Sequence, residues 1–159
     1  MAQFAGDARR WKAFGISSTK SITTMRAAIV GKEVFLRPPS KSDLSEFLAL
    51  NRGSRRLHRG LVSPPLQPDQ FATFLKKCGR VDCVCFLICR VEDGAVIGSV
   101  TLSQIFRGGF QNAYLGYYVG GTYARRGYMT EALQLTLRYT FEKLKLHRLE
   151  ANIQPANIA

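Results

Sequence analysis

Hydrophobic residues along the chain follow two patterns that predict strands and helices. Runs rich in aromatic and β-branched residues predict strands over residues 33–37, 83–91, 96–105, 113–119 and 147–154. Apolar residues that recur every three or four positions predict helices after Ser40, over residues 69–77 and from Thr130 onward. The segment 51–67 between the first two helices is basic and contains adjacent prolines, so we expect it to be irregular.

The last predicted helix is the longest. Thr130 is a good residue to cap its first turn, and the Glu131 carboxylate complements the helix dipole there. The apolar stripe of this helix consists of Leu133, Leu137, Phe141 and Leu144. A meander of three antiparallel strands directly precedes the helix, and one strand follows it. This order predicts an α+β fold, with a mixed, mainly antiparallel sheet flanked by helices.

Length and composition limit the possible architectures. The chain has 159 residues, of which 46% are hydrophobic, and this suits one domain with a core. We expect a basic N-terminal extension over residues 1–28 and the domain over residues 29–159. An organellar transit peptide, or translation that begins at Met25, are other interpretations of the extension. No apolar run approaches the ~20 residues of a membrane helix, so we expect no membrane partner.

The formal net charge of +12 favours an anionic partner, which could be nucleic acid, anionic lipid or a phosphorylated small molecule. No predicted helix has a dense basic face with interleaved aromatic residues. We therefore expect nucleic acid to bind only through nonspecific charge. The sequence does not predict an oligomeric state.

The four cysteines are clustered in one part of the chain, at Cys78, Cys83, Cys85 and Cys89. No histidine lies nearby, and the spacing does not match that of zinc ligands. Successive positions on one face of a strand also suit a disulfide poorly. We predict buried free thiols, which indicate a reducing, cytoplasmic compartment.

The junction between the strand 113–119 and the last helix is the strongest candidate for a binding site. Gly120 and Gly121 end the strand, and Arg125, Arg126 and Gly127 precede the helix. The first N–H groups of a helix have no partner within it, and the helix dipole favours an anion at that end. This arrangement predicts that the junction binds a phosphate or pyrophosphate group. The alternative is an ordinary turn with two solvated arginines.

A family resemblance supports the binding site. The segment VGGTYARRGYMTEAL resembles motif A of the GNAT N-acetyltransferases, written Q/R-x-x-G-x-G/A, and the Met-Thr-Glu-Ala at residues 129–132 resembles the branch that acetylates the N-terminal alanine of ribosomal proteins. The segment RPPSKSDLSEFLAL resembles the start of the same branch. Two positions depart from the motif: Ala124 stands where Gln or Arg is usual, and Arg125 where Gly is frequent.

The resemblance implies acetyl-CoA as the co-substrate. It implies a bulge in the strand 114–119, which would splay this strand from the last one and admit the pantetheine arm. The backbone groups that would hold the pantetheine belong to Tyr117, Tyr118 and Val119, and the thioester oxygen would meet an N–H near Val119. The backbone amides that would hold the pyrophosphate belong to Arg125, Arg126, Gly127, Tyr128, Met129 and Thr130. Asn157 matches the family's asparagine near the coenzyme.

The acid and base of the reaction are less well defined. Glu150 on the last strand has the chemistry of a general base, although it could instead form an ion pair with Arg148. Tyr117 and Tyr118 are candidate acids or wall residues. In the related enzymes, a stretch like LHRGLVSPP walls the acceptor side. Its His58 is a candidate, although a lone loop histidine is usually exposed.

The sequence therefore predicts an acetyl-CoA-dependent N-acetyltransferase that acts on a protein N-terminal α-amine, with the N-terminal alanine of a ribosomal protein as the leading acceptor. A small amine is the alternative acceptor. By the same resemblance, the family's last helix and hairpin would follow residue 159, so an inactive fragment is a further interpretation. A basic nucleic-acid-binding module is the remaining one.

Overall fold

The computed structural model describes residues 29–155 and 157, and the predicted extension at residues 1–28 lies outside this range. Six strands form one sheet in the order of the sequence. They are β1 (Ile29–Val30), β2 (Val34–Arg37), β3 (Val84–Arg90), β4 (Val96–Phe106), β5 (Asn112–Val119) and β6 (Arg148–Glu150). Neighbours from β1 to β5 are antiparallel, whereas β6 runs parallel to β5. The predicted mixed, mainly antiparallel α+β sheet is confirmed.

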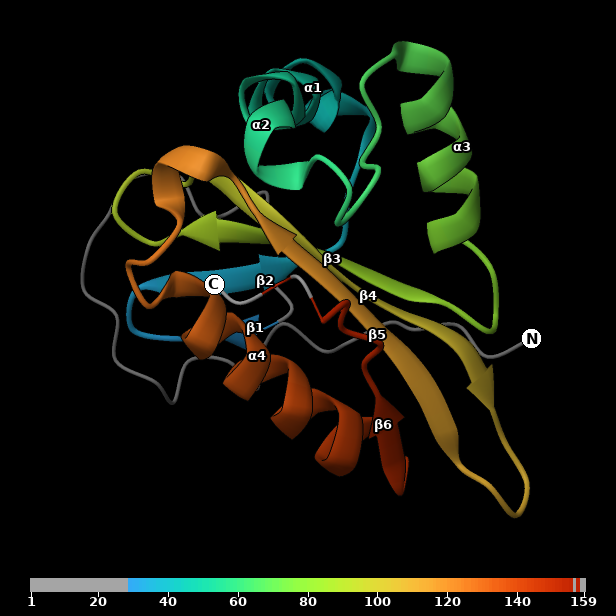
Figure 1. Cartoon of the computed structure of the whole chain (residues 1–159). Coiled ribbons are helices and arrows are strands. Elements are labelled where there is room, and N and C mark those ends of the chain that lie inside the picture. Colours follow the sequence, from blue (N-terminus) through green and yellow to red (C-terminus); the bar gives the residue numbers. More distant parts are fainter. Residues whose placement is uncertain (1–28, 156, 158–159) are drawn as a thin grey trace.

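Helices cover both faces of the sheet (Figure 1). One face carries α1 (Leu44–Gly53), α2 (Arg55–His58) and α3 (Pro68–Cys78), and the other carries α4 (Tyr128–Arg138). The prediction for segment 51–67 was wrong at its start, because α1 extends to Gly53 and α2 follows it directly. The prolines that break the helix come only after these turns. No helix among the described residues is long and apolar enough to cross a membrane.

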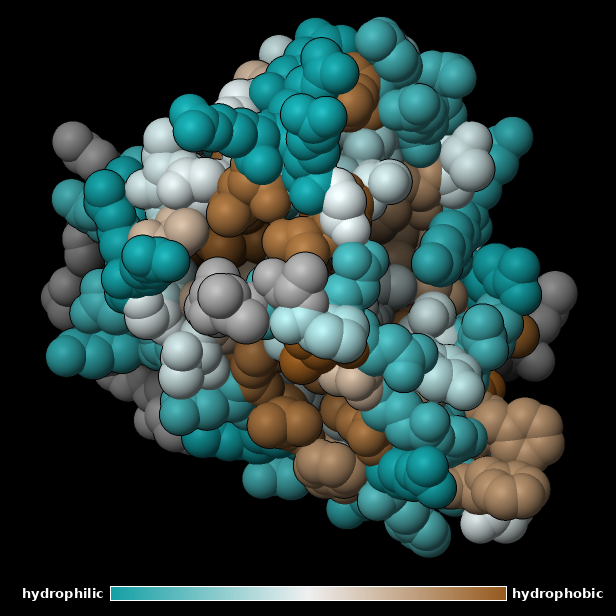
Figure 2. All heavy atoms as spheres, viewed as in Figure 1, coloured by the Kyte–Doolittle hydropathy of each residue, from teal (hydrophilic) through white to brown (hydrophobic). Residues whose placement is uncertain are grey.

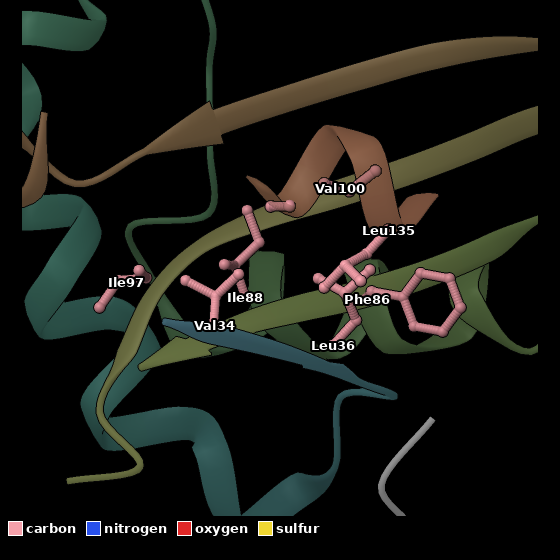
Figure 3. Close-up of a cluster of buried hydrophobic side chains, with 8 residues drawn as sticks. Val34, Leu36, Phe86, Ile88, Ile97, Val100 and Leu135 are labelled. Carbon is pink, nitrogen blue, oxygen red and sulfur yellow. The ribbon is translucent and has the colours of Figure 1, made fainter. Parts of the chain in front are cut away.

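The core below α4 is built from alternate residues of the strands (Figure 3). Val34 and Leu36 of β2, together with Phe86 and Ile88 of β3, face this helix and are almost fully buried. Leu135 of α4 packs against them. This cluster fixes α4 along the sheet and so determines where the N-terminus of α4 lies.

The buried face of α4 is not the predicted leucine stripe. The π-helical turn Tyr139–Lys143 continues α4. Leu137 and Phe141 are 39% and 42% exposed, whereas Thr136 and Thr140 are fully buried. Both threonine hydroxyls donate to the carbonyl four residues earlier, at 2.8 Å. The hydroxyls are therefore satisfied within the helix, and burying them leaves no unpaired donor. A pattern that counts only large apolar residues misses such a face.

The second core lies between the sheet and α1 and α3. Phe47 of α1 and Phe71 of α3 pack on Leu87 and Cys89 of β3. All four cysteines are free, as predicted, and three of them are buried. Burial raises the pKa of Cys83 to about 12 and that of Cys89 to about 11, so these thiols stay protonated at neutral pH.

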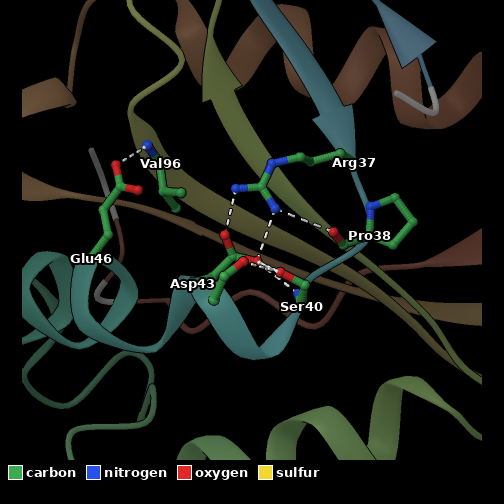
Figure 4. A network of polar contacts seen from close by, with 7 residues as sticks. Arg37, Pro38, Ser40, Asp43, Glu46 and Val96 are labelled. Carbon is green, nitrogen blue, oxygen red and sulfur yellow. Dashed lines mark hydrogen bonds and ion pairs between the residues drawn. The ribbon is translucent and has the colours of Figure 1, made fainter. Parts of the chain in front are cut away.

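A buried ion pair anchors the start of α1 to β2 (Figure 4). The Arg37 guanidinium donates to both carboxylate oxygens of Asp43, at 2.9 and 2.6 Å, and the Ser40 amide donates to Asp43 at 2.7 Å. Burial acts to raise the pKa of Asp43, but the hydrogen bonds from Arg37 and Ser40 outweigh it, and the net pKa is lowered. On the next turn of α1, Glu46 accepts a hydrogen bond of 2.7 Å from the Val96 amide.

Two irregularities shape the strands. Cys89 pairs with Val96 and Ile88 with Gly98, so Ile97 is an extra residue that forms a bulge next to Gly98. The second irregularity lies in β4 between Ser103 and Phe106. The predicted bulge within residues 114–119 was therefore misplaced, because that part of β5 pairs with β4 in regular register.

Candidate functional site

The open part of β5 is the centre of the candidate site. Among the described residues, β6 pairs with β5 only from Asn112 to Tyr114. From Leu115 to Val119, β5 has a partner strand on the β4 side alone. The predicted splay between the last two strands is therefore present, and it arises because β6 ends at Glu150 after three residues.

The direction of the backbone groups along this open edge follows from one hydrogen bond. The Gly120 amide donates to Ile97 of β4 at 2.8 Å. Backbone groups of an antiparallel strand alternate between its two sides, so those of Tyr118 face β4, and those of Tyr117 and Val119 face the open side. The Tyr117 and Val119 backbones are therefore available to an extended ligand, whereas the Tyr118 backbone is paired within the sheet.

The loop that opens α4 has the geometry of an anion site. Its cap is Gly127, with φ of +80°, and the helix begins at Tyr128. The predicted cap at Thr130 was therefore three residues too late, because a left-handed glycine already closes the turn. The Glu131 amide donates back to the Gly127 carbonyl at 3.1 Å. The amides of Tyr128, Met129 and Thr130 come before the first intrahelical bond and face the end of the helix.

Two arginines lie beside these amides. Arg125 and Arg126 are exposed, and neither forms an ion pair within the described ranges 29–155 and 157. Arg125 has φ of +59°, in the left-handed region that favours glycine. The motif frequently has Gly at this position. Here the residue is arginine, and its backbone is nevertheless in a conformation that favours glycine.

Glu131 links the loop to the other end of the sheet. It lies in the first turn of α4, as predicted, where a carboxylate suits the helix dipole. Its two oxygens also accept hydrogen bonds from the amides of Lys32 and Glu33, the second at 2.9 Å. The β1–β2 turn is thereby tied to the helix that carries the loop.

Glu150 lies at the closed end of the splay. Its Oε1 atom is 3.1 Å from Nε of Arg148, which is the ion pair that we considered as the alternative to a catalytic role. Glu150 pairs with Tyr114, five residues before Val119, which is roughly 16 Å along the strand. Asn157 lies beyond β6 and is exposed, and its amide donates to the Gln154 carbonyl at 2.9 Å.

The helices α1 and α2 lie against the open end of β5, and together we call them the α1–α2 wall. Two hydrogen bonds join this wall to the end of β5 and the residues after it. The Gly121 amide donates to Ser54 Oγ at 2.9 Å, and His58 Nε2 lies 2.9 Å from the Val119 carbonyl oxygen. The expectation that His58 is exposed was wrong, because it is only 4% exposed and lies on α2. Its partner is 61 residues away, so no local signal could reveal this contact.

Unpaired polar atoms gather at this wall. Four buried side-chain nitrogen or oxygen atoms lack a hydrogen-bond partner in the described part of the chain, and three of them belong to Asn51, His58 and Tyr118. The ring of His58 meets the ring of Tyr118 edge-on, with 5.1 Å between centroids. Burial raises the pKa of Tyr118 far above its ordinary value, and the Asn51 side chain lowers it by less. The Tyr118 hydroxyl therefore stays protonated.

A cavity of about 900 Å³ opens beside the α1–α2 wall. Asn51 and His58 line it, together with three arginines, the 60–66 loop and the start of α3. The arginines are Arg55, Arg56 and Arg59, and Asp69 is the acidic residue of the lining. Figure 2 shows that hydrophilic side chains gather over these helices. The cavity therefore presents mainly positive charge next to the end of β5.

Comparisons with known proteins agree with this geometry. The family model described as acetyltransferase (GNAT) domain matches residues 33–159. "Probable N-acetyltransferase YjcK" of Bacillus subtilis is 31% identical over 138 residues, which cover 80% of this chain and 75% of that protein. "[Ribosomal protein uS5]-alanine N-acetyltransferase" of Escherichia coli is 36% identical over 66 residues, 42% of this chain. The match spans only 34% of the length of that enzyme.

Solved structures show the same fold. Mycobacterium smegmatis RimJ, determined in complex with CoA-disulfide, superposes with a TM-score of 0.71 and 22% sequence identity. The superposition covers 79% of this chain and 64% of that chain.

Proposed function

Since the chain belongs to the acetyltransferase (GNAT) domain family, whose acetyl donor is acetyl-CoA, we propose that it transfers the acetyl group to the α-amine of a protein N-terminus. The N-terminal alanine of a ribosomal protein is the leading acceptor, because the partial match to the uS5-alanine enzyme points to that chemistry. A cytoplasmic location suits both this acceptor and free thiols.

The observation that carries the proposal is the continuity of the open edge of β5 with the anion loop. Leu115 and Tyr117 direct their backbone groups to the open side, as does the Val119 N–H, and the chain then turns through Gly127 into the N-terminus of α4. A pantetheine arm is an extended chain with amide groups, so it can add to such an edge as a strand would. The pyrophosphate at its end needs the amides from Arg125 to Thr130 and the two arginines beside them.

The chemistry needs a held thioester and a neutral amine. The Val119 N–H faces the open side and would donate a hydrogen bond to the thioester oxygen, stabilising the charge that develops on it. The amine nitrogen forms a bond to the carbonyl carbon, and the carbon–sulfur bond then breaks. The amine nitrogen gives up a proton as the amide forms, and the departing thiolate takes up a proton.

The cavity beside the α1–α2 wall is the proposed entrance for the acceptor. Its arginine-lined rim would attract an acidic segment that follows the reacting amine, and about 900 Å³ admits several residues of an extended peptide. A small amine remains the alternative acceptor, since nothing about the open edge of β5 requires a peptide.

The test combines binding with transfer. Acetyl-CoA at 100 times its dissociation constant should stabilise the protein by ~2.7 kcal/mol, which raises the melting temperature by several degrees. The protein should then acetylate a peptide that begins with alanine, and not the same peptide with a blocked N-terminus. Faster transfer to polyamines would favour the small-amine alternative, and neither shift nor transfer would overturn the proposal.

Two glycine variants test the anion loop. Gly127 and Gly108 have φ of +80° and +77°, and an added Cβ would meet no atom within 4 Å at either position. Gly127→Ala and Gly108→Ala should therefore each lose a similar stability, roughly 1–2 kcal/mol. Only Gly127→Ala should also lose most of the acetyl-CoA shift, because it alters the turn that presents the amides. Equal shifts in the two variants would remove the loop from the binding site.

A further inference from the structure

Three of the four unpaired buried polar atoms in the described residues lie at one place, where the α1–α2 wall meets β5. Asn51 is fully buried and His58 is 4% exposed, so solvent does not satisfy these atoms. Native proteins pair nearly all such atoms, because an unpaired one is costly. A cluster of three therefore indicates a place that a ligand or an ordered water completes.

The hydrogen bond from His58 determines which of its two ring nitrogens is unprotonated. Its partner, the Val119 carbonyl oxygen, can only accept, so the proton lies on Nε2. In the neutral ring, Nδ1 is then a free lone pair, and it is the atom without a partner. The same Val119 presents its N–H to the open side of β5, so His58 is fixed to the residue that the thioester oxygen would meet.

We propose that His58 is the general base of the transfer and that its Nδ1 accepts the proton that the acceptor amine must lose. This inference rests on the proposed function. The acceptor enters as an ammonium ion, one proton moves to Nδ1, and the neutral amine attacks the thioester carbon. The second proton of the nitrogen leaves with the thiolate, and the imidazolium returns its proton to water through the cavity. The products are the amide, coenzyme A and one released proton.

The cavity gives the route to this atom. Asn51 and His58 both belong to its lining, and the bare Asn51 Oδ1 is a second acceptor for an ammonium group. Nδ1 itself has no contact with solvent, so the entering amine must displace part of the wall next to it. Glu150, the base suggested by the sequence, is paired with Arg148 at the closed end of the splay.

Several charged or titratable groups surround His58 and bear on its pH dependence. Arg55 and Arg56 lie on α2, Arg59 follows that helix, and Asp69 faces them from α3. Tyr118 of β5 packs against the ring. All five groups are unchanged when only His58 is replaced. A difference in the pH dependence of kcat/KM between the variant and the wild type therefore reports the imidazole alone.

The experiment compares His58→Gln with His147→Gln. The glutamine amide can still donate to Val119 O but has no basic nitrogen at the position of Nδ1, whereas His147 is exposed and serves as the matched control. With acetyl-CoA and an alanine-initiated peptide, kcat/KM of His58→Gln should fall by roughly 6–11-fold at pH 7, because an α-amine with a pKa of about 7.7–8.0 is only about 9–17% neutral there. The loss should shrink toward pH 9, where the amine deprotonates by itself. His147→Gln should follow the wild type.

A positioning role gives a different result. If His58 only holds Val119, His58→Gln should match the wild type at every pH, and the inference is overturned. The acetyl-CoA thermal shift of His58→Gln should equal that of the wild type, which separates loss of the base from loss of folding or of coenzyme binding.

A second readout does not depend on the acceptor. The chain has two histidines, so nitrogen NMR of His147→Gln reports His58 alone. We expect the proton on Nε2 and an unprotonated Nδ1 at pH 8, as the hydrogen bond to Val119 requires. A proton on Nδ1 at pH 8 would overturn the inference even if the proposed acceptor is wrong. Failure of the wild type to acetylate any amine would overturn the proposed function instead.

Discussion

The anion loop and the α1–α2 wall meet at the same end of β5, but they are built in different ways. The loop, residues 120–131, follows β5 directly and takes its form from local features: a left-handed Gly127, the first turn of α4 and two exposed arginines. The wall comes from a segment more than 60 residues earlier. His58 connects it to Val119 of β5, and Ser54 connects it to Gly121 of the loop.

Their chemistry differs in the same way. The loop offers backbone amides, which any residue other than proline can supply, so its function depends on conformation more than on side chains. The wall offers particular side-chain atoms, the His58 Nδ1 and the Asn51 Oδ1, which function only if tertiary contacts hold them in place. The comparison indicates that coenzyme binding should survive changes that disturb the wall.

The largest effect should come from the ion pair that anchors the wall. Asp43→Ala leaves the buried Arg37 without its partner, and we expect a loss of about 3–5 kcal/mol in the free energy of unfolding. Asp82→Ala, which removes the partner of the exposed Arg80, should leave the urea midpoint nearly unchanged. Equal midpoints for the two variants would show that the buried pair does not hold α1.

The acid dependence of stability follows from the lowered pKa of Asp43. The unfolded carboxyl has a pKa of about 3.9, so the stabilisation by Asp43 is complete above that value and is lost as the pH falls through the lower folded pKa. The free energy of unfolding of the wild type, measured with urea, should therefore fall below about pH 4. Asp43→Ala should lack this part of the acid dependence. If the folded fraction of Asp43→Ala still binds acetyl-CoA normally, the loop does not depend on the wall.

The same contrast explains what the sequence could predict. The strand–loop–helix order is local, and the structure has it within about one turn of the predicted positions, with Gly127 in the loop before the helix. The anion site that we propose on this loop stays a prediction. The cap was misplaced, because a left-handed glycine ended the turn before Thr130. The buried face of α4 was missed, because threonines that bond their own helix can fill a core position.

The wall could not be predicted, because its contacts are long-range. Nothing near His58 in the sequence indicates that its Nε2 meets the carbonyl of Val119. The position of the strand irregularity in β4 likewise depends on how β4 pairs with β5, and not on the composition of either strand alone. Sequence reasoning therefore predicted residues for the coenzyme side in detail, whereas for the acceptor side it offered only the stretch around His58 and missed the contact of His58 with Val119.

The charges of the loop should have a smaller effect than the buried pair. Replacing Arg125 and Arg126 together by glutamine removes two charges beside the amides, and we expect acetyl-CoA to bind roughly 10-fold more weakly at low salt. The difference from the wild type should shrink as salt is raised. Isothermal titration of acetyl-CoA into the double variant and into Lys76→Gln/Lys77→Gln, which alters two exposed cations on α3, makes the comparison. Equal affinities would show that the backbone amides act alone.

The smallest effect separates the charge of Arg125 from its conformation. Arg125 holds φ of +59°, which costs a non-glycine residue roughly 1–2 kcal/mol, so Arg125→Gly relieves strain. Part of the gain is offset by the greater freedom of glycine in the unfolded chain, and a net stabilisation of about 0.5–1 kcal/mol should remain. If conformation is what the loop requires, Arg125→Gly should bind acetyl-CoA at least as tightly as Arg125→Gln. Weaker binding by the glycine variant would mean that a side chain at position 125 is needed to hold the loop rigid. The backbone conformation of the loop would then not be enough for binding.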